Sequence, residues 1–214
     1  MKFAYFVTPH IGGTWTVYKS VHAGLEKRGI DVRWLGVGPS ALATYNDPQW
    51  FEERSTGIVA GGNTEDEREQ AKDIIAKLDS GGFDGVFVNA ACNRVHSNVI
   101  RYLPAQIRRI MTVHTITVAT YAGARVLRGH VHATVCVSPR IRDDLVARHG
   151  FSAIHTRLIP NALHLSPFAH RTHESHTGGT LKLLSLGRLI DSDKGVFWVP
   201  RIMDRLRDCS VHLT

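Results

Sequence analysis

Stretches with the composition of buried strands alternate with stretches of helical periodicity along most of this 214-residue chain. The first pair is typical, because Lys2–Thr8 is mostly apolar and Thr14–Arg28 repeats apolar residues at Val17, Val21 and Leu25. Parallel strands need a long crossover between them, and this alternation has the spacing of βαβ units. We therefore predict an α/β protein with a doubly wound parallel sheet that helices cover on both faces.

The alternation continues to about residue 160. Gly29 stands where a helix-ending glycine is expected. Ser138 precedes Pro139, a pair that indicates a helix N-cap followed by the first helical residue. The other expected strands are Asp31–Val37, Asp84–Asn89, Arg109–His114, Ala133–Val137 and Thr156–Pro160, and the other expected helices are Asn93–Tyr102, Val118–Leu127 and Pro139–His149.

One segment of the first half has no clear periodicity. Residues 38–63 are rich in Gly, Pro, Asn and Asp, and we expect a long loop there with a short strand near Ile58. The next helix is expected to run to about Leu78, because Thr64 followed by Glu67 has the spacing of a capping box.

The second half changes composition after the last of these strands. Residues 165–179 combine Pro, Gly, Ser, Thr and His without apolar periodicity, which is typical of a linker. We therefore predict a first domain at 1–164, this linker, and an incomplete second unit at 180–214 with a helix near Val196–Leu206 and a strand at Val211–Leu213. A single βαβ unit cannot cover both faces of its own sheet, so we expect the chain to be truncated.

Neither a metal site nor a disulfide framework is expected. A histidine spacing of three would suit a metal on a helix, but in this linker composition we expect a solvated tract at His170, His173 and His176. The cysteines are widely spaced in apolar surroundings, and we expect buried free thiols at Cys92, Cys136 and Cys209.

The net charge of +7 is concentrated in one region. Residues 101–160 contain nine arginines and two aspartates, a pattern that suits an anionic partner or a merely solvated basic face. Arginines and aromatic residues do not alternate as on a stacking platform, so we expect no nucleic acid partner. Peripheral contact with an anionic membrane stays open. The arginines concerned are Arg101, Arg108, Arg109, Arg125, Arg128, Arg140, Arg142 and Arg148.

The sequence shows no segment that would cross a membrane. No run of about 18 apolar residues occurs. The first residues fit a strand and lack the cleavage signature of a secretory signal. We expect a cytoplasmic protein, with attachment to the inner face of the membrane as the open alternative.

The segment Leu181–Gly195 has the pattern of an anion site. An apolar strand leads into Gly187-Arg188, a short polar turn follows, and Lys194 opens a helix. Glycine lets the backbone approach a ligand, and a helix N-terminus favours anions. With one guanidinium and one ammonium in the same turn, Arg188 and Lys194 are candidates to bind a diphosphate.

A second glycine-rich turn follows the first strand. Gly12 and Gly13 lack the GxGxxG spacing of a dinucleotide fold, which disfavours a dehydrogenase. The pair would allow close approach of a ligand, and the alternative is a tight turn that needs the backbone freedom of glycine.

Taken in order, four segments resemble the amino-terminal domain and the first part of the carboxy-terminal domain of a family 4 glycosyltransferase of the GT-B type. Each segment alone is a weak signal, and the ordered set covers nearly the whole chain. The segments are HIGGTWTVYKSVHAGLEKRGIDVRWL, TVHTIT, VCVSPRIRDDLVARHGF followed by RLIPNAL, and LSLGRLIDSDKGV. The family pattern has Gly after Pro-Asn, whereas Ala162 stands here.

This resemblance implies a Rossmann-like acceptor-side domain, and a donor domain that has only begun by residue 214. It implies that a sugar passes from a nucleotide-sugar, with retention, to an acceptor that is a sugar, a lipid-linked molecule or a small molecule. His114 would lie beside the transferred sugar as the catalytic residue, and Gly12, Gly13, Arg188 and Lys194 would bind the donor. The donor is a substrate, and no cofactor or metal is implied.

Two alternatives remain open at this point. The first is a non-catalytic module that binds an anionic partner, and the second is another GT-B enzyme such as a sugar epimerase or phosphorylase. The acidic motif of the family would lie beyond Thr214, so we expect little or no transfer by residues 1–214 alone.

Overall fold

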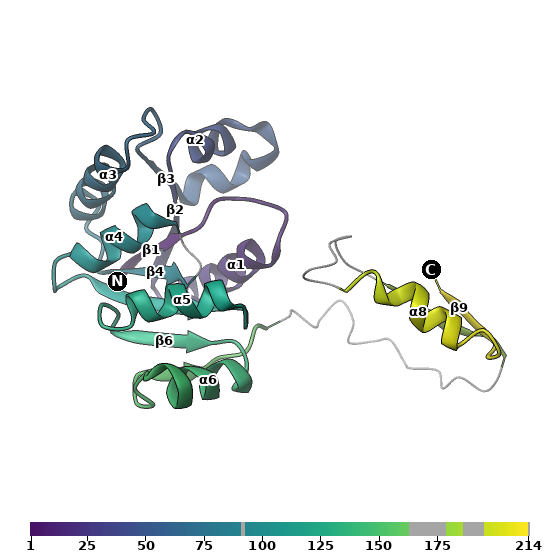
Figure 1. Ribbon diagram of the computed structural model, residues 1–214. Coiled ribbons are helices and arrows are strands. Elements are labelled where there is room, and N and C mark those ends of the chain that lie inside the picture. Colours follow the sequence, from purple (N-terminus) through teal and green to yellow (C-terminus); the bar gives the residue numbers. More distant parts are fainter. Residues whose placement is uncertain (91–92, 163–178, 186–194, 214) are drawn as a thin grey trace. The chain divides into compact units, whose positions relative to one another are not determined.

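The computed structural model describes residues 1–90, 93–162, 179–185 and 195–213. The chain divides into two compact units, Met1–Leu163 and His164–Thr214 (Figure 1). The expected linker, residues 165–179, lies outside the described residues except for Gly179.

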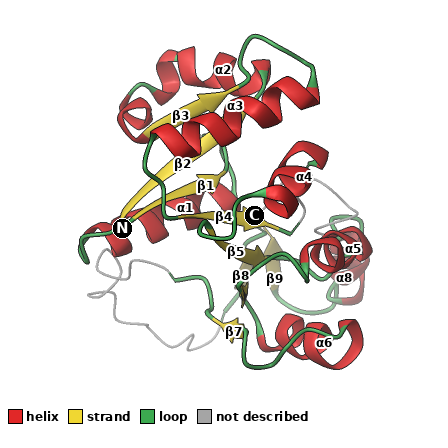
Figure 2. Cartoon of the chain, turned by 90° about the vertical axis from the view of Figure 1, so that its left-hand side faces the viewer, coloured by secondary structure: helices red, strands yellow, loops and turns green. Residues whose placement is uncertain are grey.

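The first unit is built on a parallel sheet, which confirms the expected fold class. The strands lie in the order β3-β2-β1-β4-β5-β6-β7, and every neighbouring pair is parallel (Figure 2). Their bounds are β1 Lys2–Phe6, β2 Asp31–Val37, β3 Gly57–Ala60, β4 Gly85–Asn89, β5 Arg108–Val113, β6 Ala133–Cys136 and β7 Thr156–Leu158.

Helices cover this sheet on both faces. Helices α3 to α6 follow one another along one face, each packed on the next (Figure 1). Helix α1 packs on the other face against β2, and α2 contacts β2 and β3. The bounds are α1 Gly13–Glu26, α2 Pro39–Asn46, α3 Glu67–Ser80, α4 Arg94–Tyr102, α5 Val118–Leu127 and α6 Pro139–His149.

The two faces bury two separate sets of side chains. Phe3 and Tyr5 of β1 pack with α1, whereas Ala4 and Phe6 pack beneath α3 to α6. The alternation follows from the period of two in a strand, which sends successive side chains to opposite faces. Each fully buried large side chain contributes roughly 1.5–3 kcal/mol to stability. β1 is therefore the strand on which both layers of the core depend.

The segment at 38–63 corrects one expectation and confirms another. The short strand near Ile58 is present as β3, but the expected long loop contains α2 and two 3₁₀ turns, Pro48–Trp50 and Glu52–Thr56. Pro39 stands in the first turn of α2, a position that proline suits because its missing N–H would have no partner there. A helix of eight residues is too short to show clear periodicity in the sequence.

The cap of α3 also differs from the expected one, whereas that of α6 agrees with it. Asp66, and not Thr64, is the N-cap of α3, with its carboxylate accepting from the backbone N–H groups of Arg68 and Glu69. Thr64 instead accepts from the N–H of Asp66. The carboxylate is the stronger cap because its charge also complements the helix dipole.

The described part of the second unit is a small parallel pair of strands with one helix. Strand β8, Leu181–Leu183, pairs with β9, Val211–Leu213, and α8 spans Trp198–Arg205. Cys136 in the first unit is buried as expected, but Cys209 in the second unit is exposed, which corrects the expectation of a buried thiol. Cys92 lies outside the described residues. None of the described helices has both the length and the apolar character that a membrane crossing requires.

A substitution at Gly85 tests the close packing of the central strands. A Cβ on Gly85 would lie 2.7 Å from the carbonyl oxygen of Arg108 and 2.5 Å from the ring of Phe3. We expect Gly85→Ala to lower the free energy of unfolding by about 1–3 kcal/mol, because backbone cannot yield as a side-chain tip can. The measurement is urea denaturation of the purified chain.

The matched control is Gly24→Ala on α1, where an added Cβ meets nothing within 4 Å. This change is expected to raise the free energy of unfolding by roughly 0.5–1 kcal/mol, since alanine favours helix. Equal effects of the two variants would show that β1, β4 and β5 are not packed as described.

Candidate functional site

The order of the strands creates a crevice beside β1. This strand bonds to β2 on one side and to β4 on the other, so the chain leaves the carboxyl ends of β1 and β4 in opposite directions. Ligands of open α/β sheets bind at such a switch point. A cavity of about 210 Å³ lies there, lined by Phe6, Val7, Thr8, His10, Asn89, Asn93 and His96.

His10 is held firmly in the loop after β1. Its Nδ1 donates to the carbonyl oxygen of Thr8 at 2.8 Å, and its Nε2 lies 2.9 Å from the hydroxyl of Thr14. A carbonyl can only accept, so Nδ1 is the donor in this contact, and the Thr14 hydroxyl pairs with Nε2. The ring therefore ties the end of β1 to the first turn of α1.

The two glycines of this loop differ in what they allow. A Cβ on Gly12 would lie 2.7 Å from Cδ2 of His10, whereas a Cβ on Gly13 would meet nothing within 4 Å. Gly12 is the N-cap of α1 and Gly13 is its first residue. The structure thus explains Gly12 by the space that the His10 ring needs, and a donor-binding role for either glycine remains a prediction.

His114 follows β5 and contacts the same crevice through Asn89. Its Nε2 lies 3.0 Å from Oδ1 of Asn89, which also accepts from the Tyr5 hydroxyl at 3.5 Å. The amide nitrogen of Asn89 donates to the carbonyl of Phe6 at 3.5 Å. These three contacts fix the amide so that its oxygen faces His114, and Nε2 of His114 must then donate.

Burial sets the charge of the His114 ring. It lowers the pKa of His114, so the neutral form is favoured at pH 7. With the proton on Nε2, Nδ1 is left as an acceptor, and it takes part in none of the hydrogen bonds between described residues. A half-buried acceptor at the carboxyl edge of the sheet can accept a hydrogen bond from a donor group of a ligand.

Two further residues of the crevice, Asn93 and His96, were not expected from the sequence. Asn93 caps α4 by accepting from the backbone N–H of His96 at 2.8 Å. The ring of His96 packs on Phe6 with centroids 4.7 Å apart, and burial lowers the pKa of His96 to about 4. Only the spatial meeting of β1 and β4 brings these residues beside His10, and the sequence holds no local signal of that meeting.

The candidates for diphosphate binding cannot be placed. Arg188 and Lys194 lie outside the described residues, so their role remains a prediction. Across the described ranges, no three His, Cys, Asp or Glu side chains are grouped as a metal site would require.

Most of the arginines singled out in the sequence have partners. Three on α6 form ion pairs, because Arg140 and Arg148 contact Asp144 and Arg142 contacts Asp143. Two others donate to backbone carbonyls, Arg109 to Ile100 and Leu103, and Arg128 to His149. Part of the positive charge of this region is therefore paired with groups of the fold itself.

Comparison with known proteins agrees with this geometry. The family model described as Glycosyltransferase Family 4 matches residues 11–166. No curated protein matches the chain by sequence.

Solved structures share the fold at low sequence identity. A glycosyltransferase from Rickettsia africae has a TM-score of 0.61, and the lipopolysaccharide outer core galactosyltransferase WaaB has 0.67. Each is 13% identical, and each match covers 100% of this chain and 67% of the other. A candidate UDP-N-acetylglucosamine 2-epimerase from Listeria monocytogenes has a TM-score of 0.53 at 11% identity, over 99% of this chain and 61% of its own. The chain thus spans about two thirds of the length of these glycosyltransferases.

The neighbouring glycines allow a direct test of the loop after β1. We expect Gly12→Ala to displace the His10 ring and break its bond to Thr14, whereas Gly13→Ala leaves both in place. Imidazole ¹⁵N NMR reports the change, since Nε2 of His10 would lose its hydrogen bond to Thr14. The same His10 spectrum in both variants would show that Gly12 does not make room for the ring.

The buried histidines predict a loss of stability in acid. In the unfolded chain His96 and His114 titrate near pH ~6.5, but in the fold the pKa of His96 is about 4 and that of His114 is also lowered. The unfolded state then binds more protons, so stability is complete above pH ~6.5 and is lost as the pH falls toward ~4. Urea denaturation across this interval should show a smaller loss for His96→Phe than for wild type. Equal losses would contradict the burial of His96.

Proposed function

The chain belongs to glycosyltransferase family 4. From this premise we propose that it is part of a glycosyltransferase that moves a sugar from a nucleotide-sugar donor to an acceptor hydroxyl. The observation that supports the proposal most is the cavity at the switch point between β1 and β4. Its walls hold His10, Asn89, Asn93 and His96, which are hydrogen-bonding groups of the kind that orient a sugar.

In this proposal His114 acts at the edge of the same site. Its Nε2 is bound to Asn89, and the free Nδ1 accepts a hydrogen bond from a hydroxyl of the transferred sugar. A neutral ring suits this role better than a cation, because a cation has no acceptor nitrogen. The positioning of the sugar by Nδ1 is the contribution that we assign to His114.

The donor would be bound by the second unit. Arg188 and Lys194 would hold its diphosphate and stabilise the negative charge that develops as the bond to the anomeric carbon breaks. We propose retention of the anomeric configuration and no metal ion, by analogy with the family. Gly12 and Gly13 would bring backbone close to the donor when the units come together around it.

We expect little or no transfer by residues 1–214 alone. The described part of the second unit contains a sheet of two strands, and such a sheet is marginally stable by itself. Transfer is therefore measured both on residues 1–214 and on any longer product of the same gene.

The two alternatives are less well supported. A module for an anionic partner would need free cations, and five of the eight arginines have the partners described above. Contact with an anionic membrane remains a prediction, tested by salt-sensitive binding to acidic vesicles. An epimerase shares the fold, but the family model that matches is that of glycosyltransferases.

Transfer of label from a panel of radioactive nucleotide-sugars to acceptors in a cell extract tests the function. We expect His114→Ala to lower kcat/KM by about 10²-fold, a typical loss for one positioned polar group in an active site. Arg188→Ala should weaken nucleotide-sugar binding by about tenfold in calorimetry, because one charge-assisted contact to the diphosphate is lost.

The control for both is His155→Ala, which replaces an exposed histidine before β7, at the opposite edge of the sheet. It should leave transfer and binding unchanged. The absence of labelled product with every nucleotide-sugar, or full activity of His114→Ala, would refute the proposed function.

A further inference from the structure

The side chain of Asn89 connects the central strand of the sheet with His114. Asn89 is the last residue of β4, and it is half-buried. Because β4 pairs with β1 on one side and with β5 on the other, a side chain at its end reaches both neighbours. Its amide contacts Tyr5 and Phe6 of β1, and it contacts His114 after β5. The position of β1 is thus transmitted to His114 through one amide.

The carbonyl of Phe6 decides which way this amide faces. A carbonyl oxygen can only accept, so the Asn89 atom that lies 3.5 Å from it is the donor Nδ2. Oδ1 then lies on the other side, where the Tyr5 hydroxyl donates to it at 3.5 Å. Burial raises the pKa of Tyr5 to about 12, so this hydroxyl keeps its proton at pH 7. The reversed amide would set its own oxygen against that of Phe6.

The orientation of the amide fixes the proton of the His114 ring. Nε2 of His114 lies 3.0 Å from Oδ1 of Asn89, and an amide oxygen has no hydrogen to give. Nε2 must therefore donate, and Nδ1 of the neutral ring is an acceptor. An amide is also uncharged, whereas a carboxylate at the same place would favour the imidazolium form.

The surroundings of His114 contain no other group that would favour a charged ring. Burial lowers the pKa of His114 below its usual range. Among the described residues, the other titratable groups at the crevice are Tyr5 on β1, His10 after β1 and His96 on α4. None of these is an anion at pH 7, since the pKa of Tyr5 is about 12 and a histidine is neutral or cationic. The absence of charge at position 89 is therefore what matters most.

We propose that Asn89 is a positioning residue, whose amide holds the proton of His114 on Nε2 and presents Nδ1 to the transferred sugar as an acceptor. The inference rests on the proposed function, in which Nδ1 accepts a hydrogen bond from a sugar hydroxyl. An acid at position 89 would keep the hydrogen bond to Nε2 but convert the ring to imidazolium, in which Nδ1 donates. The amide thus decides whether the ring offers the sugar an acceptor or a donor.

The proton of His114 is measured first, without any substrate. Imidazole ¹⁵N NMR of residues 1–214 separates protonated from bare ring nitrogens, and the spectrum of His114→Ala assigns the signals. In the wild-type chain we expect the proton on Nε2 and a bare Nδ1 at pH 7. Asn89→Asp should raise the pKa of His114 above ~6.5, because a neighbouring negative charge favours the cation.

The pH dependence of transfer then shows whether the acceptor matters. Asn89→Asp should lower kcat/KM by about tenfold at pH 7, since a pKa about one unit above the pH leaves about a tenth of the rings neutral. The activity should recover as the pH rises through the raised pKa, where the neutral ring returns. Asn89→Ala should lose activity equally at every pH, because it removes the acceptor and adds no charge. In the His114→Ala background, Asn89→Asp should add no pH dependence.

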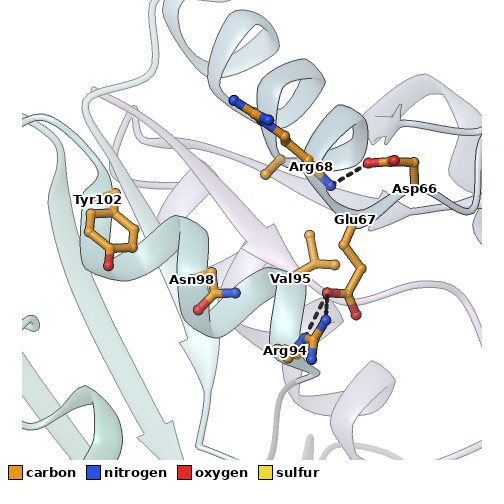
Figure 3. Close-up of a pocket in the computed structure, with 8 residues that line it drawn as sticks. Asp66, Glu67, Arg68, Arg94, Val95, Asn98 and Tyr102 are labelled. Atoms are coloured by element: carbon orange, nitrogen blue, oxygen red, sulfur yellow. Dashed lines mark hydrogen bonds and ion pairs between the residues drawn. The ribbon is translucent and has the colours of Figure 1, made fainter.

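The matched control is Asn98→Asp, the same exchange at an exposed residue of α4. Figure 3 shows Asn98 between Arg94 and Tyr102 along α4, in a pocket lined by residues other than those of the crevice at Asn89. This variant should leave the titration of His114 and the pH profile of transfer unchanged.

Three results would overturn the inference. They are a proton on Nδ1 of His114 in the wild-type chain, an unchanged His114 titration in Asn89→Asp, and a loss of activity in Asn89→Asp that is the same at every pH. The last would mark a residue that only supports the fold. The proposed function fails separately, when no nucleotide-sugar gives labelled product. In that case the NMR experiment alone still decides whether Asn89 sets the proton of His114.

Discussion

The hydrogen bonds of β1 to strands on both sides decide where the crevice of the first unit lies. β1 pairs with β2 and β4, and the chain leaves β1 toward β2 but leaves β4 toward β5, in opposite directions along the sheet. The carboxyl ends of the two strands therefore cannot be closed by one loop, and a crevice results. The two core layers depend on the same strand, since its successive side chains enter opposite faces. Stability and binding thus share one element of the fold.

The sequence predicted the regular part of the fold well. The strands and helices have strong periodicity, and their alternation admits few arrangements other than a parallel sheet. The errors lie where local signals compete. At residues 38–63 the many glycines and prolines indicated a loop, although the short helix α2 forms there. Before α3, both Thr64 and Asp66 can cap a helix, and the sequence analysis favoured Thr64 although Asp66 is the cap.

The site was predicted less completely, for a physical reason. His114 follows a strand and was chosen because the resembled family has a histidine at this place, and its role stays a prediction. Its partner Asn89 and the ring of His96 lie on the neighbouring strand and helix, and they meet His10 only through the pairing of β4 with β1. A contact between residues about 80 positions apart leaves no periodic pattern in the sequence. The donor-binding role expected of Gly12 stays a prediction, and what the structure explains is the need for glycine beside the His10 ring.

The amide of Asn89, at the end of β4, joins β1 to the residue after β5 in one hydrogen-bonded set. It contacts Tyr5 in the core of one face, the backbone of Phe6 on β1, and His114 at the edge of the site. A change at any of these side chains alters what the amide can do for the others. Among homologous chains, positions 5, 89 and 114 should consequently change together rather than singly, so that a substitution in the hydrophobic interior would be accompanied by a change at the position after β5.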